Sequence, residues 1–480
     1  MPSSLKSAAI SGVFWSFIDR FINQLVQFVV VIILARLLTP EDFGLVGMLT
    51  VFMLLANTLV DSGLSHALIQ RQHRTETDFS TAFCSHCLLA LTLYGVLYLS
   101  APAIAHFYHE PELVGLSRLL FLGLLINALT MVHDARLIIA LNFKAKAQLN
   151  FFAVLISGGV GIISAYQGEG YWSLVYQAIT RSVCYLVFIY GCFWWKPTAK
   201  PSLASLNSLL GYGSRLMLAG LLSVFSGNLA ALLIGRYFSA QTLGYYTQGK
   251  KYPELLSITI TTILQRVTFP VLSQMQDDTD RLLSVYSRIL RMTAFVTIPV
   301  MTGFAITAES FVVLLLTEKW LPVVGVIQGL CVAMMITPLN AVNLSLLTAS
   351  GRSDLLLKLD LVKAPFSIAI TAVTVPYGLT AIVAGQCFLK IISFLLNAYY
   401  PGKFYNYGLW HQLKAMVPVL TAVLIMHLAI GMLPTLTIAV DYLLTITVGV
   451  MTYLFAAYVL KIDEFFEILH IIKIRLINKV

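Results

Sequence analysis

Residues 28–63 read FVVVIILARLLTPEDFGLVGMLTVFMLLANTLVDSG, two apolar runs on either side of a short polar connection. Each run belongs to an apolar segment of about 18 to 25 residues, which is the length an α-helix needs to cross a bilayer. Such segments recur along the whole chain of 480 residues. In hydrocarbon only helices and closed barrels satisfy every backbone amide, and the sequence lacks the ten-residue alternation of barrel strands. The pattern therefore predicts an all-α, polytopic membrane protein.

The composition supports a membrane protein, since 58% of the residues are hydrophobic and 11% are charged. An ordinary soluble domain carries about 25% charged residues, so no soluble fold could bury this much apolar surface. The net charge of +9 does not indicate nucleic acid, because the basic residues are scattered through short connections. Their bias to alternate connections predicts cytoplasmic N- and C-termini, with Lys250 and Lys251 in an outer connection.

A window of about 19 residues places about 14 transmembrane helices, with 12 as the alternative count. The first apolar run lacks a cleavage site and is expected to be retained as a span. Among the others, 251–270 is the least regular, because Tyr252-Pro253-Glu254 interrupts its start. The predicted spans are 11–35, 43–65, 80–100, 114–134, 149–167, 171–195, 212–235, 251–270, 289–308, 322–347, 356–376, 379–400, 414–433 and 439–460.

The two halves of the chain contain an internal repeat. Arg36 in ARLLTPEDFG and Arg236 in IGRYFSAQTLG each end the first span of a series, and each is followed by glycine eight residues later. Six spans separate the copies, so both halves insert with the same orientation and form parallel repeats about an axis along the membrane normal. We predict six-helix lobes at 1–200 and 201–405, followed by two additional helices and a cytoplasmic tail at 406–480.

Charged residues inside the spans are the main indication of function. Each costs about 2.5 to 3.5 kcal/mol on insertion scales and usually faces a bundle interior or a hydrated cavity. Several are basic, and a cationic cavity within hydrocarbon suits an anion such as a diphosphate. The predicted cationic cavity consists of Arg20, Arg181, Arg266, Lys363 and Lys390.

Simpler interpretations remain open for these charges. Asp360 and Lys363 are three residues apart and could neutralise each other, and Arg266 could reach the headgroups. Acidic residues could bind Na⁺ or H⁺ for coupling or could balance charge, while Asp61 before Ser62-Gly63 could instead cap a helix break. The acidic candidates are Asp19, Asp61, Glu254 and Asp360.

No pattern indicates a cofactor, a metal site or catalytic residues. Cys84-Ser85-His86-Cys87 has no second pair of ligands elsewhere in the sequence, so packing inside a span explains it. The histidines and glutamates between 106 and 112 fit a solvated outer loop. No connection is long enough for a separate catalytic domain.

These motifs resemble the polysaccharide transporter family of the multidrug, oligosaccharidyl-lipid and polysaccharide exporter superfamily, and within it the colanic-acid-type and O-antigen flippase-like exporters. The similar segments, in order, are GVFWS, ARLLTPEDFGLVGM, VDSGLSHALIQRQ, LLGYGSRLMLAGLL, LIGRYFSAQTLGYY, QRVTFPVLSQMQDDTDRL and TEKW. The residues before TEKW depart from the Phe-Gly usual in the family. The resemblance implies twelve core helices with two additional ones, alternating access and a cationic cavity, and it favours a substrate role for Arg266.

The resemblance also implies a function. We expect a flippase of the bacterial cytoplasmic membrane that moves undecaprenyl-diphosphate-linked oligosaccharide, without a cofactor and with Na⁺ or H⁺ coupling left open. Membrane lipid, a polymerase and chain-length machinery would be its partners, and nucleic acid would not. A cation-coupled drug or metabolite antiporter of the same fold is the alternative and predicts an acidic cavity. A membrane glycosyltransferase or polymerase would need a sizeable outer loop.

Overall fold

The computed structural model describes residues 22–276, 278–352, 354–434 and 437–477. Every regular element in these ranges is helical, and twelve helices there are long and apolar enough to cross a membrane. Two further predicted spans also fall on helices. One is Ile22–Leu37, and the other is α14 (Asp354–Thr374), which carries several charges. The prediction of an all-α polytopic fold is confirmed.

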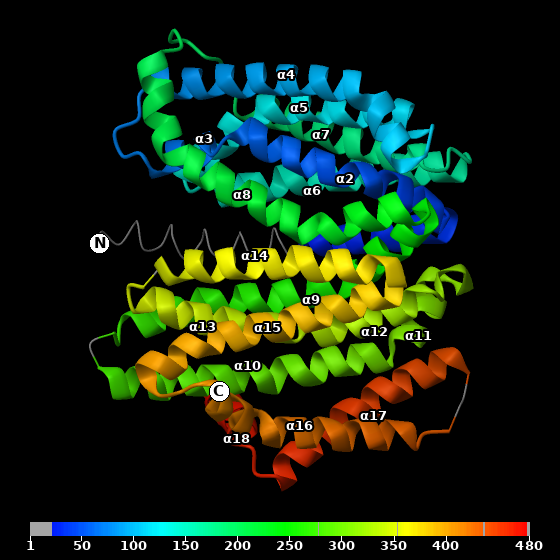
Figure 1. Cartoon of the computed structure of the whole chain (residues 1–480), viewed down its shortest axis with the longest axis vertical. Helices are drawn as coiled ribbons and strands as arrows, with labels where there is room; N and C mark the ends of the chain where they lie inside the picture. The colour runs from blue at the N-terminus through cyan, green and yellow to red at the C-terminus, as the bar shows by residue number, and fades with distance from the viewer. Residues whose placement is uncertain (1–21, 277, 353, 435–436, 478–480) are drawn as a thin grey trace. The chain divides into compact units, whose positions relative to one another are not determined.

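The first compact unit of the chain ends at Gly244. In Figure 1 its helices run roughly along one another, and α5 packs against α4 and α7. Pro40 opens α2 behind a capping box in which the Thr39 hydroxyl accepts from the Asp42 amide and the Asp42 carboxylate accepts from Thr39. The unit contains Ile22–Leu37, α2 (Pro40–Asp61), α3 (Leu64–Gln70), α4 (Glu76–Tyr108), α5 (Leu113–Ile139), α6 (Phe143–Tyr166), α7 (Trp172–Cys192) and α8 (Leu203–Tyr237).

The second unit begins at Tyr245, and its core lies between α10, α13, α15, α16 and α17. A fully buried hydrogen-bonded triad of Tyr286, Asn343 and Gln412 joins α10, α13 and α16 inside this core. The helices are most of α9 (Ala240–Ser273), then α10 (Thr279–Ile306), α11 (Ala308–Phe311), η1 (Val312–Leu316), η2 (Glu318–Trp320), α12 (Val323–Met334), α13 (Ile336–Ala349), α14, η3 (Val375–Tyr377), α15 (Leu379–Tyr405), α16 (Leu409–Gly431), α17 (Ile438–Val459) and α18 (Asp463–Ile477).

Helix α9 corrects the prediction for its region. It begins at Ala240 rather than near residue 251 and continues through Pro253 and Pro270, so Lys250 and Lys251 lie inside a candidate span and not in an outer connection. Proline is tolerated in membrane helices because neighbouring groups satisfy the freed carbonyls. The repeat explains the start, since the Ser239 hydroxyl accepts from the Thr242 amide as Thr39 does from Asp42, 200 residues earlier.

The predicted lobes and the compact units divide the chain differently. Helix α8, which the repeat assigns to the second lobe, packs on α2, α3 and α4 in the first unit. Its N-terminal turn is tied to α4, where Asp78 accepts hydrogen bonds from Ser205 and, at 3.1 Å, from Arg71. Units describe packing whereas the lobes follow from sequence repetition, so the lobe boundaries near 200 and 405 stay a prediction.

The starts of α2 and α9 cross with their backbones in contact, and both sides of this crossing belong to the first unit. A Cβ added to Gly44 would lie 1.7 Å from the Ala240 carbonyl oxygen. A Cβ added to Gly244 would lie 1.8 Å from the Pro40 carbonyl oxygen. The two contacts are reciprocal and are related by the 200-residue offset of the sequence repeat. Only glycine fits at either position.

Candidate functional site

Three helices of the second unit bring lysines together around one position of α15. The Lys390 ammonium interacts electrostatically with Lys250 and Glu254 of α9. It also interacts with Lys363 of α14. Lys250 and Glu254 are four residues apart, and therefore share one face of their helix. We call Lys250, Lys363 and Lys390, together with Glu254, the lysine cluster.

The lysine cluster carries three positive charges, which face Glu254 inside the cluster and Asp360 beside Lys363. Lys250, Glu254 and Lys390 lie in helices long and apolar enough to cross a membrane, where each charge costs about 2.5 to 3.5 kcal/mol on insertion scales, and Lys363 lies on the more highly charged α14. An arrangement that places like charges together at such cost is expected where an anion binds, because an anion relieves the mutual repulsion.

Lys363 also forms an ion pair with Asp360, as one of the simpler interpretations of the sequence allowed. Its Nζ lies 3.6 Å from Oδ1 of Asp360. The Asp360 side chain is 69% exposed while that of Lys363 is 19% exposed, so the carboxylate lies at the solvent-accessible side of the pair. Exposed ion pairs of this kind contribute little. The pair therefore moderates the charge of Lys363 without removing Lys363 from the lysine cluster.

The predicted cationic cavity does not appear as one cluster in the described residues. Arg266 is exposed and follows Lys250 by about 24 Å along α9, at 1.5 Å per residue. Arg181 is exposed on α7 in the first unit. Arg20 and Asp19 lie outside the described residues. The structure thus groups Lys363, Lys390 and Glu254 and leaves the part played by the arginines a prediction.

Lys250 is the member of the cluster that the sequence analysis missed. The repeat contained the signal, because the 200-residue offset aligns Lys250 with Thr50, and Thr50 lies well inside the span predicted at 43–65. The misleading feature was Pro253, which suggested that the helix starts after Lys250. The alignment of Lys250 with Thr50 therefore places Lys250 inside a span, in agreement with the continuous helix α9.

Asp61 lies apart from the lysine cluster, at a break between α2 and α3 in the first unit. Ser62 and Gly63 both have left-handed backbones, with φ of 48° and 68°, which ends α2 at Asp61. The expected helix break is present, but no side chain caps the start of α3. The Asp61 carboxylate instead accepts a hydrogen bond from Ser65 and lies 3.9 Å from Nε2 of His86.

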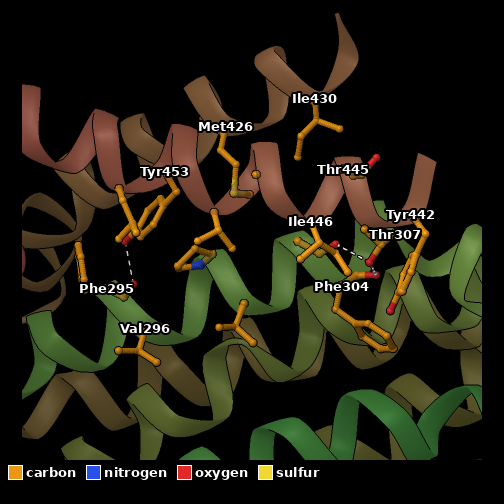
Figure 2. A pocket seen from close by; sticks show the side chains of 16 residues that line it. Phe295, Val296, Phe304, Thr307, Met426, Ile430, Tyr442, Thr445, Ile446 and Tyr453 are labelled. Atoms are coloured by element: carbon orange, nitrogen blue, oxygen red, sulfur yellow. Dashed lines mark hydrogen bonds between the residues drawn. The ribbon is translucent and has the colours of Figure 1, made fainter. Parts of the chain in front are cut away.

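An apolar pocket of about 400 Å³ opens between α10, α16 and α17 in the second unit (Figure 2). Figure 2 shows Tyr453 beside Phe295, with the tyrosine hydroxyl donating to the Phe295 carbonyl oxygen at 2.7 Å. Because that hydroxyl is satisfied internally, the pocket presents mainly hydrocarbon. Its lining residues are Phe295, Val296, Pro299, Val300, Gly303, Phe304, Thr307, Met426, Ile430, Tyr442, Thr445, Ile446, Gly449, Val450, Tyr453 and Leu454.

The cysteines and outer-loop histidines form no metal site in the part of the chain that the structure describes, where no group of three or more His, Cys, Asp or Glu side chains converges. In the loop after α4, burial raises the pKa of the Glu110 carboxyl, and the negative charges of Glu41 and Glu112 raise it further. His109 contacts Arg236 at the end of α8. These contacts tie the loop to the fold.

Comparison with known proteins decides the family. Residues 33–325, more than half of the chain, match the model of a family described as polysaccharide biosynthesis protein. The chain belongs to that family. The resemblance noted in the sequence is therefore confirmed, and the matched region runs from the end of the first apolar run to the start of α12.

Three curated relatives extend the match. The teichuronic acid biosynthesis protein TuaB of Bacillus subtilis is 25% identical over 83% of this chain and 83% of its own length. The lipopolysaccharide biosynthesis protein WzxC of Escherichia coli is 26% identical over 82% and 81%. The succinoglycan biosynthesis transport protein ExoT of Rhizobium meliloti is 24% identical over 68% and 67%.

Solved structures identify the fold. The lipid II flippase MurJ in an inward closed conformation superposes with a TM-score of 0.74 at 14% identity, over 95% of this chain and 99% of that one. A multidrug resistance MATE family transporter in an inward-facing conformation gives 0.62 at 17% identity, over 79% and 95%. At these identities the similarity establishes a shared fold and carries no inference about substrate.

Proposed function

We propose that this chain is a flippase that moves undecaprenyl-diphosphate-linked oligosaccharide repeat units across the bacterial cytoplasmic membrane by alternating access. It is a multi-pass membrane transporter rather than an enzyme, and it serves the synthesis of surface polysaccharide. The observation that carries the proposal is the lysine cluster. A polysaccharide biosynthesis protein that places three partly buried lysines around one position of α15 is suited to hold the anionic headgroup of a lipid-linked sugar.

The lysine cluster would act on the diphosphate. Lysine ammonium groups bind phosphate oxygens as point charges, and their attraction is stronger among apolar helices than in water. Moving a diphosphate and sugar hydroxyls through bare hydrocarbon would cost tens of kcal/mol, since each unsatisfied polar group costs about 2 to 7 kcal/mol. A hydrated cationic route lowers that barrier without making or breaking a covalent bond. Glu254 would keep the site from holding the anion too tightly.

The prenyl tail needs no polar route. It can remain in lipid while the headgroup crosses, and the apolar pocket between α10, α16 and α17 suits a segment of hydrocarbon chain. Each methylene taken from water into such a pocket contributes about 0.8 kcal/mol. The proposal thus separates recognition of the charged headgroup from accommodation of the tail.

The remaining charges complete the proposal. Arg20, Arg181 and Arg266 would line other parts of the headgroup's route, and Asp19, Asp61, Glu254 and Asp360 would balance charge or take part in coupling to Na⁺ or H⁺. Both termini would be cytoplasmic. A polymerase and chain-length machinery would receive the flipped unit on the outer side.

The antiporter alternative is less consistent with the site. A cavity that concentrates organic cations needs surplus acidic groups, whereas the lysine cluster sets three lysines against one glutamate. A glycosyltransferase would need a catalytic loop, and the longest stretch between the described spans of the first unit is the one between α2 and α4, which holds only the short helix α3. Export of cationic dyes by purified protein in liposomes, without activity on lipid-linked sugar, would favour the antiporter.

Deletion of the gene followed by analysis of lipid-linked sugars tests the proposal. We expect repeat units to accumulate on the cytoplasmic leaflet and wild-type protein to clear them. Lys390→Gln should fail to clear them, because it removes the central charge of the lysine cluster, while Lys390→Arg should retain part of the activity. Lys358→Gln is the matched control, since Lys358 on α14 is 65% exposed and pairs with Asp354 at 3.3 Å. Normal delivery of units to the outer leaflet in the deletion strain would refute the proposal.

A further inference from the structure

His86 is a fully buried imidazole with one nitrogen left without a partner. It lies on α4 about 15 Å from the start of that helix, at 1.5 Å per residue. Its Nε2 is 3.3 Å from the Asp61 carbonyl oxygen, and its Nδ1 has no hydrogen-bond partner. A buried polar atom left unpaired costs about 1 to 3 kcal/mol. Such a position needs an explanation other than packing.

The contacts define the protonation chemistry of this imidazole. Because Nε2 faces a carbonyl oxygen, Nε2 carries the proton and Nδ1 has a free lone pair. A proton added to Nδ1 would make an imidazolium ion, and the Asp61 carboxylate at 3.9 Å would offset its charge. The Ser65 hydroxyl donates a hydrogen bond to that carboxylate. The Asp61 side chain is 27% exposed, so water can deliver the proton to the pair.

Asp61 supplies the charge that lies beside the buried His86 imidazole. Among the described residues, Asp61 is the charged group that acts electrostatically on the imidazole. From α3 the pair meets the Ser65 hydroxyl, while His66 is exposed. On the flanks, Cys84 and Cys87 of α4 form no disulfide and Arg215 of α8 is exposed. From α2, α4 and α5 the neighbouring packing is apolar, with Val60, Ala90 and Ala128 fully buried.

The same helix break is in backbone contact with α8. A Cβ added to Gly63 would lie 2.3 Å from the Gly213 carbonyl oxygen, and one added to Gly213 would lie 2.7 Å from the Ser62 carbonyl oxygen. Protonation would draw the imidazole from the Asp61 carbonyl toward the Asp61 carboxylate, and so would release a backbone acceptor at the break. Since no side chain separates the break from α8, a shift of Ser62 and Gly63 is passed directly to α8.

We propose that Asp61 and His86 form a proton-binding site whose occupancy sets the packing of α8 on the break between α2 and α3. One carboxylate and one imidazole can hold a proton but lack the set of oxygen ligands that a metal cation needs. The use of this site to couple proton binding to transport rests on the proposed function, whereas proton binding itself does not. Protonation of the pair is a change of one charge at a buried contact, which is how histidine switches act.

Hydrogen exchange of the purified full chain in nanodiscs, followed by mass spectrometry between about pH 5 and pH 8, tests the site without any substrate. After correction for intrinsic exchange, we expect protection of residues 60–70 and 205–220 to change together with pH in the wild type. His86→Gln and Asp61→Asn should each lose this change. The control His66→Gln, a change at an exposed position of the same break, should keep it.

Two outcomes would overturn the proposal: protection in both segments that is independent of pH in the wild type, or pH dependence that persists in both variants. Asp61→Asn preserves the shape of the carboxylate and guards against misfolding of His86→Gln, and each variant is scored only by its own pH dependence. A flippase whose exchange does not respond to pH would leave the proposed function intact and remove only the proton site. A pH response in a protein that does not clear lipid-linked sugar would support the proton site and contradict the proposed function.

Discussion

The crossing of α2 and α9 supports a quantitative prediction. In Gly44→Ala the new Cβ would start 1.7 Å from the Ala240 carbonyl oxygen and 2.4 Å from its carbonyl carbon. Carbon and carbonyl oxygen approach no closer than about 3.3 Å, so the two helix starts must separate by about 1.6 Å. Both sides are backbone within helices, so no side chain can rotate away to relieve the contact.

The energetic consequence follows from overpacking. Forcing an extra methyl group into a packed contact costs about 1 to 3 kcal/mol, and replacing glycine by alanine inside a helix returns up to about 1 kcal/mol. We therefore expect Gly44→Ala to lower the free energy of unfolding by about 1 to 2 kcal/mol. The same change at Gly244 should have a similar effect. The double variant should lose less stability than the sum of the two single losses, because both substitutions push apart the same two helix starts.

The apparent melting temperature of the purified protein in detergent measures this effect. Gly95→Ala is the matched control, since Gly95 lies inside α4 and an added Cβ there has no atom within 4 Å. This control should melt at the same temperature as the wild type or slightly above it. If Gly44→Ala and Gly95→Ala have the same melting temperature, the backbones of α2 and α9 are not in contact, and the reasoning is refuted.

Two further predictions concern stability. Tyr286→Phe removes a hydroxyl that bonds both Asn343 and Gln412 in a fully buried triad, so it should lower the free energy of unfolding by about 1 to 3 kcal/mol, and an unchanged melting temperature would contradict the triad. Thr39→Ala removes the N-cap of α2 and should cost about 1 kcal/mol, whereas Thr39→Ser should restore most of it, as melting curves of the three proteins would show.

The comparison of sequence and structure separates two kinds of charge. Lys363, Lys390 and Glu254 were identified from the sequence because a charge inside an apolar run is costly wherever the run packs. Arg266 satisfied the same criterion but is exposed and far from Lys250 along α9. The cost of insertion shows that a charge needs a partner or water, but it does not say which.

His86 illustrates the opposite case. From the sequence, Cys84-Ser85-His86-Cys87 is explained by packing within a span. The imidazole has a distinct role only because the α2–α3 break places the Asp61 carbonyl oxygen and carboxylate against it. A contact between residues 25 positions apart has no signature in local composition.

The sequence by itself determined that this chain spans a bilayer as helices, that its halves repeat, and that it carries positive charge where charge is costly. Those conclusions depend on the length and hydrophobicity of single segments, which hydrocarbon constrains directly. Only the tertiary structure decided that Lys250 joins Lys390, that Gly44 meets Ala240, and that His86 meets Asp61. These pairings depend on which faces of different helices pack together, and the bilayer does not select among those faces.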